Sequence, residues 1–136
     1  MVAIEIAYLG QLRCQAQHMP SGTRLITDAP VDNHGRGESF SPTDLVATAL
    51  GTCMLTVMGI VAEREGLDLN GTTVKVAKEM ITSPARRIGR LSVDIHIPAA
   101  LDEDDQQRLK AAAMACPVHK SLHPDIETPI SLRFGP

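Results

Sequence analysis

Two of the three cysteines in this 136-residue chain stand where a thiol could do chemistry. Cys53 lies in the middle of a long uncharged segment, whereas Cys116 directly precedes Pro117 and is followed by His119. If Pro117 is the first residue of a helix, Cys116 is its N-cap, where free backbone N–H groups stabilise a thiolate. His119 and Lys120 add positive charge there, so local chemistry gives Cys116 the better case for a low pKa.

Each cysteine also has a plainly structural interpretation. A cysteine inside an apolar helix is commonly inert, because burial raises the pKa of a thiol unless a cation lies beside it. Arg24 and Arg36 are the candidate cations for Cys53, and their spacing in the sequence does not choose between them. Cys116 can equally be a small buried residue at a helix break. We expect Cys14, in a strand, to be structural.

Other classes of site are disfavoured by the composition. The Cys116–His119 spacing supplies at most two metal ligands, and no two cysteines have Cys-x-x-Cys spacing, so we expect no metal and no cofactor. A net charge of −3 and an aromatic content of 2% argue against binding nucleic acid. The N-terminal stretch contains Glu5 and no basic segment, so we interpret it as a strand rather than a leader. Three cysteines without such a leader then suggest a reducing, cytoplasmic compartment.

The uncharged segment from Leu45 to Ala62 is at the lower edge of the length that spans a membrane, which needs about 20 apolar residues. Two interpretations are therefore open, a membrane span and the buried central helix of a soluble core. Thr48, Thr52 and Thr56 form a polar row, and the rest of the chain has the pattern of a soluble domain. We favour the core helix and expect no membrane partner.

The elements that must position these cysteines follow from the patterning. Residues 2–9, 11–18 and 23–27 have the pattern of three antiparallel strands, with a tight turn at Gly10 and with Leu12 on the same face as Cys14. Residues 28–40 have no periodicity and predict a long loop, which is more often functional than idle.

The segment "SPTD" is a strong helix start. Ser41 is the expected N-cap, Pro42 suits the first helical position, and Asp44 completes a capping box. We expect this helix to run to Glu65, with Gly66 as its stop.

The remaining segments predict a hairpin, two helices and a final strand. The hairpin covers 72–82 and 88–97, the helices cover 101–116 and a short stretch from 117, and the last strand covers 126–134. Strands and helices occur in blocks, so the predicted class is α+β, as one domain over residues 1–136.

Two stretches of the chain together resemble the OsmC/Ohr family of peroxide-handling proteins. They are "SPTDLVATALGTCMLTVMGIVAEREGLDLNG" at 41–71 and "CPVHKSL" at 116–122. The resemblance implies an OsmC-like fold: an intertwined homodimer with long central helices wrapped by antiparallel sheets. It also implies a thiol peroxidase that reduces small organic hydroperoxides. Cys53 would attack the peroxide and become a sulfenic acid, and Cys116 would resolve it as a disulfide that a dithiol reductant resets.

The resemblance is looser for the groups that assist the reactive thiol. The family pairs that thiol with an arginine and with a glutamate that directly follows the helix-start proline. Thr43 occupies the glutamate position here, and Asp44 or Glu38 are the candidate substitutes. For the arginine we choose Arg36. The local chemistry favours Cys116 as the first nucleophile whereas the family favours Cys53, and we follow the family.

A second hypothesis is a non-enzymatic dimer that binds a small ligand or senses redox state, motivated by the missing glutamate after Pro42. Under the peroxidase hypothesis, an apolar lining from Leu50, Met54, Met58 and Ile60 would suit an alkyl tail.

Overall fold

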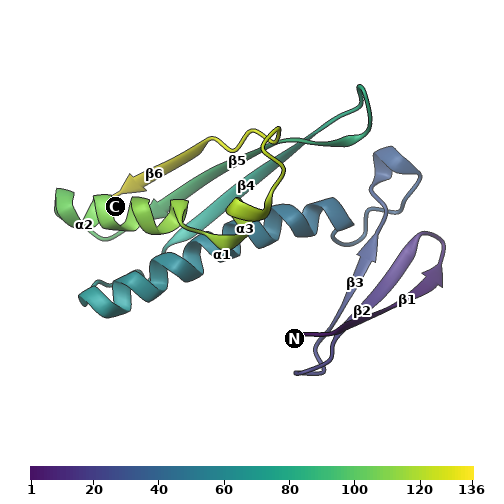
Figure 1. Ribbon diagram of the computed structural model, residues 1–136, viewed down its shortest axis with the longest axis horizontal. Helices are drawn as coiled ribbons and strands as arrows, with labels where there is room; N and C mark the ends of the chain where they lie inside the picture. The colour runs from purple at the N-terminus through teal and green to yellow at the C-terminus, as the bar shows by residue number, and fades with distance from the viewer. The chain divides into compact units, whose positions relative to one another are not determined.

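The computed structural model describes every residue from Met1 to Pro136, and contacts within the chain divide it into two units, Met1–Val46 and Ala47–Pro136. The first unit holds three strands; the second holds most of the long helix, two further helices and three more strands (Figure 1). Strands and helices occur in blocks, which confirms the α+β class. That residues 1–136 form a single domain stays a prediction.

The first unit is built on an antiparallel sheet of β1 (Ile4–Gly10), β2 (Arg13–His18) and β3 (Arg24–Asp28) in that order. Gln11 and Leu12 form the turn between β1 and β2 and both have positive φ, 53° and 63°. Such turns match the twist of a hairpin. The predicted strand over 11–18 was therefore wrong at its start: Leu12 lies in the turn and is exposed, so it does not share the face of Cys14.

The loop after β3 was predicted correctly and contains one short 3₁₀ turn, η1 (Val31–Asn33). Gly35 folds back onto Ala29, donating its backbone N–H to the Pro30 carbonyl at 2.9 Å. A Cβ at position 35 would collide with the Ala29 carbonyl, so the loop requires glycine there.

The long helix α1 (Pro42–Glu65) begins as predicted. The Asp44 N–H donates to Ser41 Oγ at 3.1 Å and the Ser41 N–H donates to Asp44 Oδ2 at 2.9 Å, which is a capping box. The helix ends before Gly66, whose φ is 70°. By length and composition α1 could cross a membrane, and 33% of its most apolar stretch is buried in the protein. A core helix has the same length and composition.

The second unit contains a sheet of β4 (Thr73–Ile81), β5 (Arg87–Ile97) and β6 (Ile130–Phe134). β4 and β5 form the expected antiparallel hairpin, but β6 runs parallel to β5, with Ile130 opposite Val93. The expectation of wholly antiparallel sheets was wrong here. The chain leaves β5, passes through two helices and returns beside β5, and such a crossover brings the next strand back in parallel.

The core of the second unit lies between this sheet and the helices α1 and α2 (Glu103–Met114) (Figure 1). On β5, alternate side chains are almost completely buried: Leu91, Val93, Ile95 and Ile97. Gly51 lets α1 approach β4 closely, because a Cβ there would stand 3.0 Å from Val76 and 3.4 Å from Val74. The chain then continues from α2 into the short helix α3 (Pro117–Ser121).

Candidate active site

Cys53 and Cys116 are neighbours in the second unit, the arrangement that the family resemblance implies. Cys53 is carried by α1 and is half-buried, whereas Cys116 precedes α3 and has 0% of its surface exposed. The two thiols are close enough for Cys53 to raise the pKa of Cys116, and neither thiol is in a disulfide. Two sulfur atoms far apart in the sequence therefore share one site.

The break between α2 and α3 directs the Cys116 side chain. The Cys116 N–H donates to the Ala113 carbonyl at 3.3 Å, so Cys116 still closes the end of α2. Pro117 has no N–H and starts a new helix, with Cys116 as its N-cap. The His119 N–H donates to Cys116 Sγ at 3.4 Å, which confirms the predicted capping position.

The prediction of a low pKa for Cys116 was wrong. Burial raises the pKa of this thiol above its ordinary value, and the neighbouring Cys53 thiol raises it further. The N–H groups of His119 and Val118 lower the pKa, but the net shift is upward. Sequence patterning located the helix terminus, but it could not show that the sulfur there is sealed from water.

The neighbours of Cys53 on α1 differ from the apolar lining that we expected. Leu50, Met54 and Met58 have 0% exposure and belong to the packed core, where they anchor α1 against the rest of the unit. Only Ile60 of the four expected lining residues is exposed, at 58%. The three core residues therefore fix the position of Cys53 and do not line an open cavity in this chain.

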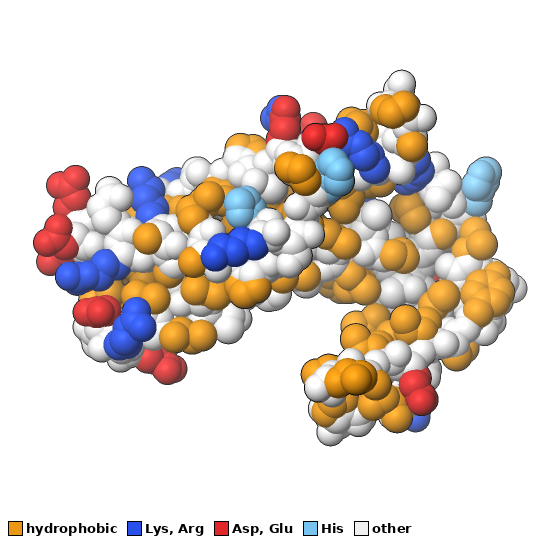
Figure 2. Space-filling view, viewed as in Figure 1, with side chains coloured by type: hydrophobic (Ala, Val, Ile, Leu, Met, Phe, Trp, Pro, Cys, Tyr) orange, Lys and Arg blue, Asp and Glu red, His pale blue; other side chains and the backbone are white.

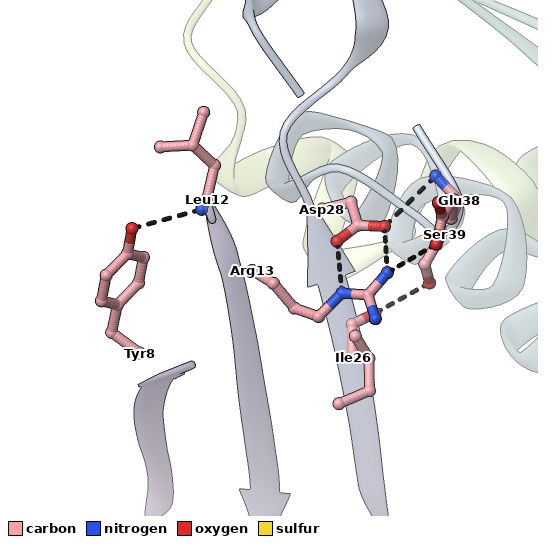
Figure 3. Close-up of polar contacts among 7 residues, drawn as sticks. All are labelled: Tyr8, Leu12, Arg13, Ile26, Asp28, Glu38 and Ser39. Carbon is pink, nitrogen blue, oxygen red and sulfur yellow. Dashed lines mark hydrogen bonds and ion pairs between the residues drawn. The ribbon is translucent and has the colours of Figure 1, made fainter. Parts of the chain in front are cut away.

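The first unit contains a cluster of charges that the sequence analysis missed. Arg13 donates to Asp28 from Nε at 2.7 Å and from Nη2 at 2.9 Å, and Nη2 also donates to Glu38 at 3.0 Å (Figure 3). The Glu38 N–H donates to Asp28 Oδ2 at 3.2 Å. Together these bonds fasten the loop after β3 to β2. Bonding to Arg13 lowers the pKa of the buried Asp28 carboxyl, and the two acids raise the pKa of Arg13.

The alternation of β2 made Arg13 look like a solvated residue on an outward face. The register of β2 against β3 could have identified the Arg13–Asp28 pair, because the two residues are directly opposite each other in the ladder. Opposite charges paired across strands attract each other. Extending the predicted pairing of 11–18 with 23–27 by one residue would have brought Arg13 and Asp28 together.

The other candidate helpers of the thiol lie in the first unit. Arg36 is close enough to Asp28 for its charge to lower the pKa of that carboxyl. Arg24 begins β3 and is exposed, and Asp44 serves the capping box of α1. The assignment of Arg36 as the partner of Cys53 stays a prediction.

Comparison with known proteins supports one family. A model of the OsmC-like protein family matches residues 35–131. No curated protein matches the sequence significantly. Among solved structures, a proposed osmotic stress induced and detoxification response protein from Psychrobacter arcticus is 44% identical, with a TM-score of 0.92 over 98% of this chain and 96% of that one.

Two more distant structures share the fold. An organic hydroperoxide resistance protein OsmC from Legionella pneumophila is 16% identical, with a TM-score of 0.79 over 98% of this chain and 96% of its own. The organic hydroperoxide resistance protein OhrB of Bacillus subtilis is 15% identical, with a TM-score of 0.71 over 98% of each chain. The family match covers most of the sequence, and the chain belongs to the OsmC-like protein family.

Proposed function

We propose that this protein is a thiol-dependent peroxidase that reduces organic hydroperoxides as part of a stress response. The observation that carries the proposal is the neighbouring pair of Cys53, which is half-buried, and Cys116, which is sealed from solvent. Relatives of the same fold in Legionella pneumophila and Bacillus subtilis are named organic hydroperoxide resistance proteins, which supports an organic substrate.

The two thiols are suited to different steps. A sulfur must be ionised and accessible to attack a peroxide. Cys116 is neither, because it has no exposed surface and because burial and the neighbouring Cys53 hold its pKa above the ordinary value. This leaves Cys53 as the first nucleophile, in agreement with the family's pattern and against the role that local chemistry first suggested for Cys116.

In the first step the Cys53 thiolate attacks one oxygen of the peroxide. An S–O bond forms, the O–O bond breaks, and the alkoxide leaves and takes a proton to become an alcohol. Cys53 is oxidised by two electrons to a sulfenic acid while the hydroperoxide is reduced by two.

In the second step the Cys116 sulfur attacks the Cys53 sulfenic acid. The S–S bond forms, the S–O bond breaks, and the Cys116 proton joins the departing hydroxide as water. A dithiol reductant then exchanges with the disulfide and restores both thiols. These reactions suit a reducing, cytoplasmic compartment, in which free cysteines persist.

The proposal includes a homodimer. Ile4, Ile6 and Tyr8 alternate along β1 and are 58%, 68% and 66% exposed, so one face of the N-terminal sheet presents a row of uncovered apolar side chains. Figure 2 shows hydrophobic side chains on the surface of this sheet. The uncovered face and the partly buried, strongly apolar α1 are what a second copy would bury.

The test is a titration of fully reduced protein with cumene hydroperoxide, followed by mapping of the disulfides by mass spectrometry. We expect one equivalent of peroxide per chain to be consumed and a Cys53–Cys116 disulfide to appear. Cys53→Ser should consume no peroxide. Cys116→Ser should consume one equivalent and hold a sulfenic acid that dimedone traps, and Cys14→Ser should behave as the wild type.

The proposal fails if the peroxide persists while Cys53 and Cys116 remain free thiols. That result, with the fold intact, would favour a dimer that binds a small ligand without turning it over.

A further inference from the structure

The short helix that follows Cys116 contains no fully buried side chain. α3 has only five residues, and none of them is buried. A helix this short contributes little stability of its own, because helix nucleation is costly. Specific bonds from α3 to the rest of the unit therefore contribute, together with the burial of Cys116 itself, to the position of the Cys116 sulfur.

His119 makes the bond that links α3 to the sheet. Its Nε2 atom is 2.9 Å from Thr128 Oγ1, and the two side chains share a hydrogen bond. The backbone N–H of the same residue donates to Cys116 Sγ. The side-chain bond of Ser121, by contrast, returns to Pro117 within the helix. One residue thus contacts both the thiol and an anchor outside the helix.

The anchor is itself fixed by the backbone. Thr128 lies between Glu127 and Pro129, and the carbonyls of those two residues accept the Leu91 and Val93 N–H groups at 2.8 Å and 2.9 Å. The Glu127 N–H donates to the Gly89 carbonyl at 3.0 Å. The residues on both sides of Thr128 are therefore hydrogen-bonded to β5. This makes Thr128 a rigid point of attachment for α3.

We propose that His119 is a positioning residue for the second step of the reaction. Through Thr128 it holds α3 so that the Cys116 sulfur stays against Cys53 when the sulfenic acid forms. This inference rests on the proposed function. The bond between His119 and Thr128 does not involve Cys53, so we expect the first step, which takes place at Cys53, not to depend on it.

The bond between His119 and Thr128 affects which of two reactions the Cys53 sulfenic acid undergoes. Attack by Cys116 gives the disulfide and water, whereas attack on a second hydroperoxide oxidises Cys53 to the sulfinic acid and releases another alcohol. If α3 is loosely held, Cys116 reaches the Cys53 sulfenic acid more slowly. A larger share of Cys53 is then oxidised to the sulfinic acid. The ratio of disulfide to sulfinic acid therefore measures the positioning directly.

The experiment uses Thr128→Val, which keeps the shape of the side chain and removes the hydroxyl, with Thr128→Ser as the matched control that retains it. Reduced protein is treated with rising excesses of cumene hydroperoxide, and both products are counted by mass spectrometry. We expect Thr128→Val to shift the ratio toward sulfinic acid about fivefold, the effect of one lost hydrogen bond. Thr128→Ser should keep the wild-type ratio, and consumption of the first equivalent should be unchanged in both.

A second pair of variants tests the other partner. His119→Leu removes the ring nitrogen and should shift the ratio in the same direction. His119→Gln can place a polar atom near the Nε2 position and should restore most of the wild-type ratio. Melting temperatures identify any variant that has lost its fold. A wild-type ratio in both Thr128→Val and His119→Leu would overturn the inference.

A readout without peroxide separates this inference from the proposed function. In a Cys14→Ser background, Ellman's reagent forms a mixed disulfide with Cys53, and Cys116 then displaces the second thionitrobenzoate. We expect Thr128→Val to slow the second release about fivefold and to leave the first unchanged. An unchanged second release overturns the positioning role, whether or not the protein reduces peroxides.

Discussion

Cys116 is sealed from solvent, whereas the neighbouring Cys53, which raises the pKa of Cys116, is half-buried. This contrast gives two chemically identical groups different properties. The sealed thiol resists ionisation, and the other thiol can be reached from outside.

The raised pKa of Cys116 predicts a dependence of stability on alkaline pH. A thiol whose pKa is higher in the folded protein contributes stability that is fully present below the unfolded-state pKa, which is about 8.5. That contribution is lost as the pH rises through the folded-state pKa. We expect the melting temperature of the reduced protein to fall above about pH 9, and that of Cys116→Ser to fall less. Equal falls in the two proteins would contradict the prediction.

The lowered pKa of Asp28 predicts that the protein loses stability as the pH falls into the acid range. A carboxyl whose pKa is lowered in the folded protein contributes stability that is present above its unfolded-state pKa, about 3.9, and lost as the pH falls through the folded-state value. Asp28→Asn should lower the melting temperature at neutral pH and remove part of the acid dependence. Circular dichroism melts from pH 2 to 7 measure both effects, and a variant as stable as the wild type at pH 7 would refute them.

Arg13 should not tolerate replacement by lysine. Its guanidinium makes three bonds, two to Asp28 and one to Glu38, and a lysine ammonium cannot reproduce this fork. We expect Arg13→Lys to destabilise the protein nearly as much as Arg13→Gln does, as measured by urea unfolding. If Arg13→Lys is as stable as the wild type, a positive charge alone is sufficient at position 13.

The predicted role of Arg36 can be tested against Arg24, the other candidate from the sequence. If Arg36 supports the Cys53 thiolate, Arg36→Gln should lower kcat/KM for cumene hydroperoxide by at least about tenfold. Arg24→Gln, a matched loss of charge, should change it less than twofold. A larger loss in Arg24→Gln would move the role to Arg24, and small effects in both would remove Arg36 from the site.

The apolar face of β1 predicts the oligomeric state. Ile6→Lys replaces an exposed side chain, so it should leave an isolated protomer folded but should disrupt a dimer that buries this face. Ala7→Lys, on the opposite face of the same strand, is the matched control. Sedimentation velocity should show monomer for Ile6→Lys and dimer for both the wild type and Ala7→Lys. A monomeric wild type would refute the homodimer.

The limits of α1 could be predicted because its capping residues and its glycine stop are local features of the sequence. Ser41, Asp44 and Gly66 act on their immediate neighbours, and the structure confirms all three. The direction of β6 was missed because strand patterning shows which face a residue occupies but not which way the strand runs.

In the candidate site, too, the local features could be predicted from the sequence and the tertiary ones could not. The thiols could be identified from residue types and motif order, and the N-cap position of Cys116 from the proline that follows it. The burial that raises the pKa of Cys116 depends on α2 and the sheet, and the Arg13–Asp28 pair depends on strand register. The burial of Cys116 and the Arg13–Asp28 pair both result from tertiary packing, which cannot be predicted from short-range sequence patterns.

The parallel crossover between β5 and β6 has a consequence for the energy of the redox cycle. Cys116 lies within that crossover, and Cys53 lies on a helix that precedes the whole sheet, so a bond between them closes a loop of more than sixty residues. In the chain-entropy description, such a closure disfavours the unfolded state by about 4 kcal/mol. The disulfide form would then be the more robust of the two, and the reductant would return the protein to a more easily unfolded, reactive form in every cycle.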